Sequence, residues 1–378
     1  MRRMRLAVVC YPTYGGSGVV ATELAIALAD RGHEVHVVSY EVPFRIDRWR
    51  PNLIFHAVEI DSYPLFRHQP YTLNLTNKLI ELVTEHDLEL IHSHYAIPHA
   101  HGAWMAHEVL LERGLDVKLA CTLHGTDITL VGRRPAYFEI TRFAITKQDA
   151  LTAPSAWLAQ EMQKHFGVCA SRCQVIPNFV DLDRFRPDPE PASRAWLAPA
   201  GERVITHASN YRPVKRVGDV IRAFAILRQR MPAVLALAGD GPELPMAEQL
   251  ARDLGVRDHL RLLGNHERIE ELFQASDLFL LPSDAESFGL AALEAQACGC
   301  PVIGYEAGGL PEVVQDGQSG ILCPIGSDAC LGTLAADLLE DEPRYQAMRK
   351  AARTSAERFH PDPIIGAYED ALRTLINS

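Results

Sequence analysis

The feature that most constrains this chain is an alternation of short apolar segments with longer amphipathic ones. In the first half, RLAVVCY, EVHVVSY, LELIHSH and VKLACTL are rich in Val and Leu and are mostly bounded by turn residues. Helical patterns lie between such segments, for example over 19–31, 71–86 and 100–113. Apolar strands that alternate with helices are typical of parallel βαβ units, whose sheets are covered on both faces. We therefore predict an α/β fold.

The alternation stops once and then begins again. The segment 177–199 contains five prolines and no clear period, as expected of a linker. After it, RVITHAS, VLALAGD, DLFLLPS and PVIGY restore the pattern, and 378 residues are enough for two domains. We predict doubly wound domains over 1–180 and 181–363. Two such domains leave a cleft between the carboxyl ends of their sheets, where ligands usually bind.

Composition excludes several classes of protein. A net charge of −11 argues against general nucleic-acid binding, although a local pocket can still be positive. The start resembles a signal peptide, but its apolar run is short and meets Tyr11 and Pro12 at once. No apolar stretch reaches the ~18 residues that span a bilayer, and the eight cysteines have neither disulfide nor zinc spacing. We expect a cytoplasmic protein without membrane insertion.

A glycine-rich turn, PTYGGSG at 12–18, follows the first predicted strand and opens the first predicted helix. Glycines let the backbone approach a ligand closely, and the N–H groups at a helix start attract anions. The spacing differs from the Gly-x-Gly-x-x-Gly of dinucleotide enzymes. An ordinary tight turn explains three glycines about equally well.

Two segments of the second half place charged residues after predicted strands. NYRPVKR at 210–216 holds three cations that can clamp a diphosphate, with a solvated loop as the alternative. ESFGLAALE puts Glu286 in a loop and Glu294 in the following helix, with seven residues between them. A single Glu in a helix is usually a surface residue, but two that bracket a Ser-Phe-Gly turn are far less common. The N–H groups of 287–289 would form an anion-binding helix start.

The order of these segments resembles that of retaining GT-B glycosyltransferases. Glu286 and Glu294, followed by GGLPE at 308–312, are similar to the nucleotide-sugar signature of that family. GGSG, HGTD at 124–127, AGDGPE at 238–243 and LGN also occur in the order of the family, so the resemblance covers essentially the whole chain. It implies two Rossmann-like domains, the first for the acceptor and the second for the nucleotide sugar, with the last helix, 364–378, packed back on the first.

Longer segments narrow the resemblance to one bacterial branch. YPTYGGSGVVATELA, HYAIPHA, TLHGTDITLVG, SNYRPVKRV and PSDAESFGLAALEAQACGCPVIG together resemble the enzymes that transfer N-acetylglucosamine from UDP-GlcNAc to the hydroxyl of L-malate, the first step of bacillithiol biosynthesis. The resemblance implies these two small-molecule substrates and an α-retaining reaction. The alternatives are the same donor with an inositol phosphate or lipid-linked acceptor, a non-catalytic sugar-nucleotide binder, or a nucleotide-sugar epimerase.

The resemblance also implies roles for single residues. Lys215 and Arg212 would neutralise the leaving diphosphate, where Arg212 replaces an arginine that many relatives carry at the position of Asn210. Glu286 would contact the sugar beside the anomeric carbon, and His124 its outer hydroxyls. The remaining donor-binding residues would be Gly16, Asn210, Ser287, Phe288, Gly289 and Glu294, the last on the ribose. The acceptor-binding residues would be Ser17, Tyr95, Thr122 and Arg142, since an arginine can grip a carboxylate with two hydrogen bonds.

No cofactor or catalytic metal is expected, because the cations would stabilise the leaving group. His92, His94, His99, His101 and His107 crowd one stretch, but a metal site usually adds a carboxylate or thiolate at helical spacing. We expect these histidines to pack or to contact the acceptor. The sequence leaves the oligomeric state open, and a homo-oligomer fits it.

Overall fold

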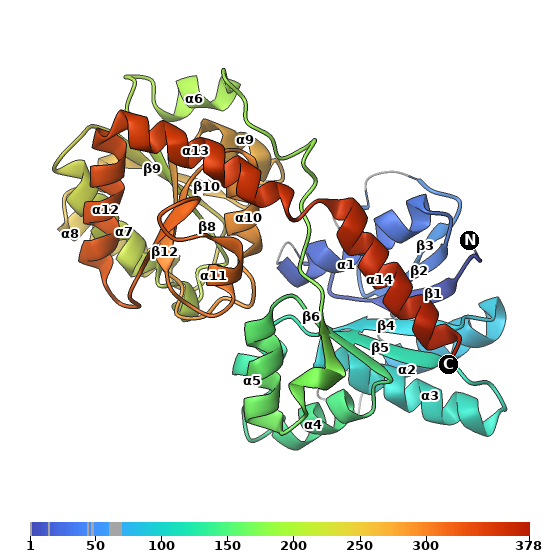
Figure 1. Ribbon diagram of the computed structural model, residues 1–378. Coiled ribbons are helices and arrows are strands. Elements are labelled where there is room, and N and C mark those ends of the chain that lie inside the picture. The colour runs from blue at the N-terminus through green and yellow to red at the C-terminus, as the bar shows by residue number, and fades with distance from the viewer. Residues whose placement is uncertain (1, 14–15, 44, 47–48, 60–69) are drawn as a thin grey trace. The chain divides into compact units, whose positions relative to one another are not determined.

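The computed structural model describes residues 2–13, 16–43, 45–46, 49–59 and 70–378, and these form two compact units. Unit 1 comprises Met1–Asn178 and Asp362–Ser378, and unit 2 comprises Phe179–Pro361. Both boundaries fall two residues before the positions predicted from the sequence. Each unit is a parallel sheet covered by helices (Figure 1), which confirms the α/β prediction.

Unit 1 is built on a sheet with the strand order β3-β2-β1-β4-β5-β6-β7, and its paired strands are parallel. The strands are β1 (Arg5–Val9), β2 (Glu34–Ser39), β3 (Leu53–Ala57), β4 (Leu90–His94), β5 (Lys118–Thr122), β6 (Ala150–Ala153) and β7 (Cys173–Val175). The helices are α1 (Gly16–Asp30), α2 (Tyr71–His86), α3 (His101–Glu112), α4 (Phe138–Thr146), α5 (Ala156–Phe166) and α14 (Pro361–Ile376).

Unit 2 repeats the plan with the strand order β10-β9-β8-β11-β12-β13, again parallel. The strands are β8 (Arg203–Ala208), β9 (Ala233–Ala238), β10 (Leu260–Gly264), β11 (Leu278–Leu281), β12 (Val302–Tyr305) and β13 (Gly320–Cys323). The helices are α6 (Ala192–Leu197), α7 (Val217–Arg228), α8 (Leu244–Asp253), α9 (Ile269–Ala275), α10 (Leu290–Ala297), α11 (Leu310–Val313), α12 (Asp328–Glu340) and α13 (Glu342–Glu357).

Each sheet has one point at which the strand order reverses. In unit 1 the reversal lies between β1 and β4, and in unit 2 between β8 and β11. At such a point the loops after the two strands leave in opposite directions and open a crevice at the carboxyl ends, where α/β proteins bind ligands. The fold therefore marks one candidate binding position in each unit.

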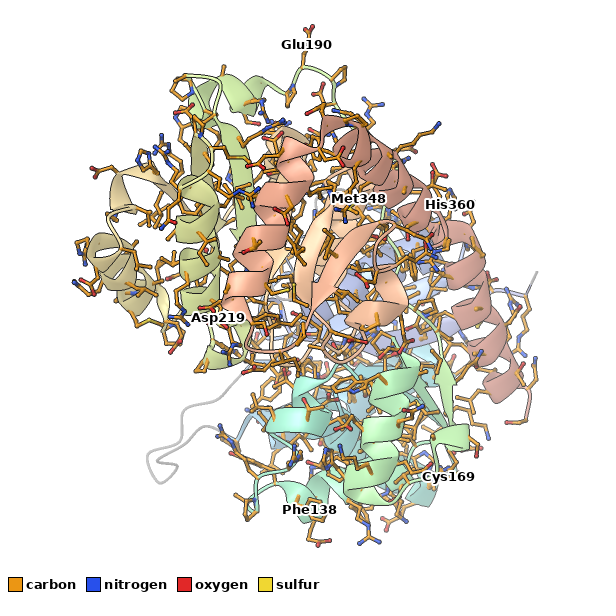
Figure 2. All side chains as sticks on the ribbon, turned by 60° about the vertical axis from the view of Figure 1, so that its left-hand side comes forward. Phe138, Cys169, Glu190, Asp219, Met348 and His360 are labelled. Atoms are coloured by element: carbon orange, nitrogen blue, oxygen red, sulfur yellow. The ribbon has the colours of Figure 1, made fainter. Side chains whose placement is uncertain are left out.

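Apolar side chains pack each sheet against its helices, and Figure 2 shows side chains filling the space between these layers. In unit 1, Val38 of the sheet packs with Leu79 and Leu82 of α2, and in unit 2, Leu235 packs in one cluster with Phe224 of α7. All of these side chains are buried, and burying each one contributes roughly 1.5–3 kcal/mol. The two cores fix the strand ends from which the candidate site residues project.

Three features of the fold bear on the sequence predictions. Residues 5–9 form the mostly buried strand β1, which confirms the predicted first strand. The predicted linker instead contains a helix, α6, and the three-residue strand β7 was missed because CQV carries no alternation long enough to read. Within the described ranges, no helix is long and apolar enough to cross a membrane.

The last helix, α14, belongs to unit 1 although it ends the chain. Its Glu369 accepts from Arg31, which follows α1, at 3.1 Å and contacts the ring of His33 at the same distance. Arg373 of the same helix bonds to Glu369 at 2.6 Å and donates to the carbonyl of Arg2 at 2.7 Å. A partly buried network of ion pairs and hydrogen bonds therefore fastens α14 to the residues that flank β1 and α1.

Candidate active site

In unit 2 the loops after β8 and β11 bring two predicted residues into direct contact. Lys215 Nζ donates to Glu286 Oε1 at 2.6 Å, and Ser283 Oγ donates to the same oxygen at 2.6 Å. The side chains of Lys215 and Glu286 are only 22% and 10% exposed. The backbone links the two loops as well, because Asp284 N donates to Val214 O at 2.9 Å. This cluster lies where the strand order of unit 2 reverses, and Ser283 is a member that the sequence did not reveal.

The GGLPE segment supports Glu286 through its backbone. Gly309 N donates to Glu286 O at 2.7 Å. Gly308 has φ +62°, and a Cβ atom there would lie 2.1 Å from the same oxygen. Any other residue would push the Glu286 loop away, so the glycine requirement of this motif has a steric cause.

A buried tyrosine, Tyr211, anchors the loop after β8 to the end of β9. Tyr211 has φ +35° and is fully buried, and its hydroxyl donates to Ala238 O at 2.9 Å. His207 Nε2 lies 2.8 Å from Ser209 Oγ, which accepts from the Tyr211 N–H. Burial lowers the pKa of His207 to about 4, so its ring is neutral near pH 7. Together these contacts fix the backbone that carries residues 210–216.

The three cations of that loop have different surroundings. Lys215 pairs with Glu286, whereas Arg216 pairs with Asp219 at 2.5 Å and Asp284 at 3.1 Å. Arg212 is exposed, as is Asn210. The sequence grouped the three cations as one clamp, but Arg216 is held by two carboxylates, whereas Lys215 has one carboxylate partner. Lys215 and the exposed Arg212 are therefore the better suited to a diphosphate.

The Ser-Phe-Gly turn leads directly into α10. Gly289 has φ +98°, a conformation that favours glycine, and the helix starts at the next residue. The Phe288 ring is 1% exposed and packs edge-on against Phe359, with ring centroids 5.5 Å apart, so only its backbone can meet a ligand. Ser287 is half-buried, as is Glu294 within the helix.

In unit 1 the chain passes from β1 into α1 through the glycine-rich turn. A Cβ atom on Gly18 would lie 2.5 Å from Thr13 O and 2.8 Å from Tyr11 O, so this turn admits only glycine. Gly16 is exposed and Ser17 half-buried in the first turn of the helix. Residues 14–15 of the motif lie outside the described residues.

Two histidines meet at the ends of β4 and β5. His94 Nδ1 lies 2.9 Å from His124 Nε2, and the rings are stacked with centroids 5.1 Å apart. Asp127 holds both loops in place. One of its oxygens accepts from the N–H groups of His124 and Gly125, and the other from that of Ala96. The aspartate of the HGTD motif thus fixes the backbone of two loops, a role that the sequence did not predict.

Tyr95 follows β4 in a strained conformation. Its φ is 97° and its ψ 134°, a region that costs a non-glycine residue about 1–3 kcal/mol. The Tyr95 N–H donates to Thr122 O at 3.1 Å, and its ring lies 5.4 Å from those of both Tyr11 and His124. This backbone conformation places the Tyr95 ring beside His124.

The other two predicted acceptor residues lie differently. Thr122 has no exposed surface, and its hydroxyl bonds to His92 Nε2 at 2.8 Å and Thr152 Oγ1 at 2.7 Å. A direct contact between Thr122 and an acceptor would require this buried chain to open. Arg142 is exposed on α4.

The histidines of unit 1 near β4 are uncharged at neutral pH. Burial lowers the pKa of His92 and His99 to about 4, and burial together with nearby His92 and His99 lowers that of His124 to about 3. His99 Nδ1 lies 2.6 Å from His94 O. Among the described residues, none of these rings belongs to a group with metal-ligand spacing. His92, His94 and His99 form a buried neutral cluster, and only His124 is partly exposed beside it.

The chain matches two families of known proteins. Residues 189–355 match Glycosyl transferases group 1, and residues 14–184 match Glycosyltransferase Family 4. Together these matches span both units.

Individual relatives cover nearly the whole chain. N-acetyl-alpha-D-glucosaminyl L-malate synthase of Bacillus anthracis is 41% identical over 371 residues, which cover 97% of this chain and 96% of that protein. D-inositol 3-phosphate glycosyltransferase of Geodermatophilus obscurus is 31% identical, covering 94% and 85%. Among solved structures, HepE of Anabaena in complex with UDP and glucose superposes with a TM-score of 0.82 at 22% identity, covering 99% of this chain and 100% of that one.

Proposed function

Because this chain belongs to the GT-B glycosyltransferase family, we propose that it transfers N-acetylglucosamine from UDP-GlcNAc to the hydroxyl of L-malate with retention of the α configuration. The name of the Bacillus anthracis relative, 41% identical over 97% of the chain, supports this acceptor over inositol 3-phosphate, whose enzyme is 31% identical. In this proposal the enzyme works in the cytoplasm and catalyses the first step of bacillithiol biosynthesis.

The observation that carries the reaction class is the Lys215–Glu286–Ser283 cluster at the strand reversal of unit 2. We assign the diphosphate of the donor to Lys215 and the exposed Arg212, with the N–H groups of 287–289 as further donors. Preorganised donors aimed at developing charge are often the largest catalytic term, and removing one costs roughly 10²–10³ in kcat. Glu294 would hold the ribose hydroxyls.

The bond changes follow from this assignment. The malate hydroxyl oxygen forms a bond to the anomeric carbon while the bond from that carbon to the β-phosphate oxygen breaks. The electron pair of the broken bond goes to the phosphate, and the hydroxyl proton passes to a phosphate oxygen on the same face of the sugar. Negative charge grows on the leaving UDP, so in this proposal the cations of Lys215 and Arg212 serve in place of a catalytic metal.

Glu286 has a second part in this scheme. In the structure it is the partner of Lys215 at 2.6 Å, which compensates the mostly buried ammonium group. A diphosphate that binds Lys215 competes for the same donor hydrogens, so donor binding would free Glu286 to accept from the sugar. Ser283 keeps the carboxylate in place during the exchange.

His124 is proposed to donate to a sugar hydroxyl. Among the described residues, Nε2 of the buried His94 has no hydrogen-bond partner. A buried ring nitrogen without a proton costs less free energy than a buried N–H group without an acceptor. The His94 proton is therefore assigned to Nδ1, which faces His124. His124 Nε2 then accepts, and the remaining ring proton of His124 sits on Nδ1. Ser17, Tyr95 and Arg142 are proposed to bind malate, whereas the buried Thr122 is proposed to position the buried His92.

Incubation with UDP-GlcNAc and one acceptor at a time tests the proposal. UDP release and product mass are measured with L-malate, with inositol 3-phosphate and without acceptor. A malate glycoside that forms only with malate supports it. UDP release without a malate adduct contradicts the acceptor, and no reaction with any acceptor contradicts the enzyme class. Arg142→Ala should weaken malate use while UDP-GlcNAc binding stays within about twofold, because its proposed contact is to malate alone.

A further inference from the structure

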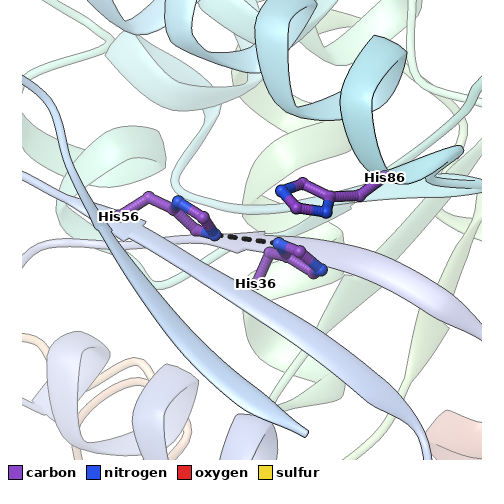
Figure 3. Close-up of side chains that lie close together, drawn as sticks. All are labelled: His36, His56 and His86. Atoms are coloured by element: carbon purple, nitrogen blue, oxygen red, sulfur yellow. Dashed lines mark hydrogen bonds between the residues drawn. The ribbon is translucent and has the colours of Figure 1, made fainter.

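Three histidines from separate elements converge on the outer part of the unit 1 sheet. His36 comes from β2, His56 from the edge strand β3, and His86 is the last residue of α2. Each offers a ring nitrogen, and these three nitrogens all lie within 4.8 Å of one another. Figure 3 shows the three rings gathered on one face of the two strands, beside the end of the helix. None of them takes part in the chemistry proposed above.

The geometry of the pair on the strands is close to that of two ligands. His36 Nδ1 lies 2.8 Å from His56 Nε2, and the rings are nearly parallel, at 6° with centroids 5.0 Å apart. Imidazole nitrogens bind Zn²⁺ at about 2.0–2.1 Å, so two tetrahedral ligands stand roughly 3.3 Å apart. A metal ion therefore needs the pair to open by about half an ångström. The His86 ring, 4.4 Å from that of His36, supplies the third ligand.

A carboxylate orients the most buried of the three rings. His36 is fully buried, and its other nitrogen, Nε2, lies 3.1 Å from Glu34 Oε1. Metal-bound histidines almost always donate their second N–H to such a partner, which fixes the ring and raises its basicity. Glu34 is held in turn by Arg3 at 2.7 Å. The arrangement thus contains a supporting shell as well as three ligands.

The surrounding charges also suit a cation. α2 ends at His86, and the carbonyl groups at a helix end carry partial negative charge. The nearby Lys78 is paired with Glu81 at 2.7 Å, so its positive charge is balanced. Burial, together with the neighbouring His36 and His86, lowers the pKa of His56 to about 4. Burial also lowers the pKa of His36. Metal binding requires neutral imidazole, so few protons compete near pH 7.

We propose that His36, His56 and His86 form a binding site for a divalent transition-metal ion, Zn²⁺ in the first instance, with water as the fourth ligand. Imidazole sites suit Zn²⁺, Ni²⁺, Cu²⁺ and Co²⁺ rather than Mg²⁺ or Ca²⁺. The ion fastens β3, which pairs only with β2 among the described strands, to both β2 and α2. Its role is structural and separate from glycosyl transfer.

Titration of the untagged full-length chain, first stripped with a chelator, tests the site. Co²⁺ is followed by visible absorbance and Zn²⁺ by competition with a chromophoric chelator. We expect one tight equivalent per chain, visible bands typical of nitrogen and oxygen ligands, and a Tm that rises with Zn²⁺. His56→Gln and His86→Gln should each lose more than tenfold in affinity, and Glu34→Gln about tenfold.

His165→Gln serves as the matched control, because His165 also has a carboxylate partner, Glu161 at 2.8 Å, but stands outside the cluster. Affinity in this variant should equal that of the wild-type chain. If a strand variant fails to fold, His86→Gln, at the end of a helix, and the effect of Zn²⁺ on the wild-type Tm still decide the question. The proposal is overturned by the absence of a tight equivalent, by unchanged affinity in His86→Gln, or by a thiolate-to-cobalt charge-transfer band, which would assign the ion to a cysteine.

Discussion

In unit 2 the ion pair with Glu286 fixes the position of Lys215, the residue to which we assign the diphosphate of the donor. Its ammonium group is mostly buried, its partner is held by Ser283, and the glycines at 308–309 hold the partner's backbone. The lysine is thus held in place before the donor binds, and only its pairing with Glu286 has to be exchanged for the diphosphate. Charge positioned in advance is the property that electrostatic catalysis requires.

Replacing this lysine should slow the chemical step. For Lys215→Ala we expect kcat to fall by roughly 10²-fold or more, because charge on the leaving diphosphate loses a donor and Glu286 loses its partner. Steady-state kinetics with UDP-GlcNAc and malate measure the change. The exposed lysine in Lys350→Ala is the control and should leave kcat unchanged. A Lys215→Ala enzyme with wild-type kcat would remove Lys215 from the mechanism.

Glu294 should behave differently, because its proposed contact with the ribose is the same before and during reaction. Glu294→Ala is expected to raise the donor KM by about tenfold, the worth of a lost hydrogen bond to a charged group, with a smaller change in kcat. Glu190→Ala, at an exposed position of unit 2, provides the comparison. An unchanged donor KM would show that Glu294 does not hold the nucleotide.

Single residues were predictable from sequence where a motif fixed their place along one loop. Lys215 and Glu286 were singled out in this way, and the structure brings them into contact although they lie 71 positions apart in the sequence. Asp127 was not, because its role depends on backbone N–H groups from two loops that only the sheet brings together. The histidine cluster was missed for the same reason, since strand pairing and the end of α2 bring its three members together.

At the scale of elements, the attachment of α14 to the rest of unit 1 involves one carboxylate, that of Glu369. Burial opposes the ionisation of Glu369, but hydrogen bonds from Arg373, Arg31 and His33 outweigh it and lower its pKa to about 2, from an ordinary value of 4.5. A carboxyl with a lowered folded-state pKa stabilises the fold above its unfolded pKa. That stabilisation is lost as pH falls from about 4.5 towards 2.

Glu369→Gln should therefore lower the free energy of unfolding of unit 1 by about 3 kcal/mol at pH 7. The difference from the wild-type chain should shrink as pH falls below 4.5. In that range the Glu369 carboxyl of the unfolded wild-type chain is protonated, so ionisation in the folded chain stabilises it less. Urea unfolding at pH 7 and at lower pH measures both effects. Asp370→Asn, the exposed neighbour on the same helix, should change stability by less than about 0.5 kcal/mol. Equal effects of the two variants would contradict the network.

Long periodic elements were read from the sequence, and short ones were not. The pattern at 71–86 matched α2 at both ends, because apolar residues recur with helical spacing and the helix ends at His86 before a left-handed Asp87. α6 and β7 are six and three residues long, so tertiary packing and not local pattern decides their form. In α6 the prolines around the helix concealed it.

At the scale of the whole molecule, buried neutral histidines are distributed unevenly. His92, His94, His99 and His124 of unit 1 all have lowered pKa values through burial, whereas in unit 2 only His207 does among the described residues. Unfolding returns each to an ordinary value of 6.5. Between about pH 6.5 and 4 the unfolded chain therefore binds more protons, so stability falls as pH falls.

Unit 1 should accordingly be the more acid-sensitive unit. Each such histidine costs about 1.4 kcal/mol of stability per pH unit below 6.5. In Trp196→Phe, which removes the exposed tryptophan of unit 2, the remaining tryptophans all lie in unit 1 and report on it alone. Urea unfolding is followed at pH 7.5 and 5.5 by tryptophan fluorescence, which reports unit 1, and by circular dichroism, which reports both units. On going to pH 5.5, the fluorescence midpoint should fall to lower urea by more than the circular dichroism midpoint. Equal shifts of both signals would contradict this distribution.

The most direct test of the proposed reaction is the proton NMR spectrum of the product from UDP-GlcNAc and L-malate. The proposed chemistry at Lys215 and Glu286 predicts one new glycoside, with the small anomeric coupling of an α linkage to the malate hydroxyl and one UDP released per glycoside. A β-linked product would contradict retention. UDP formed without a malate glycoside would contradict the acceptor and leave the donor assignment standing.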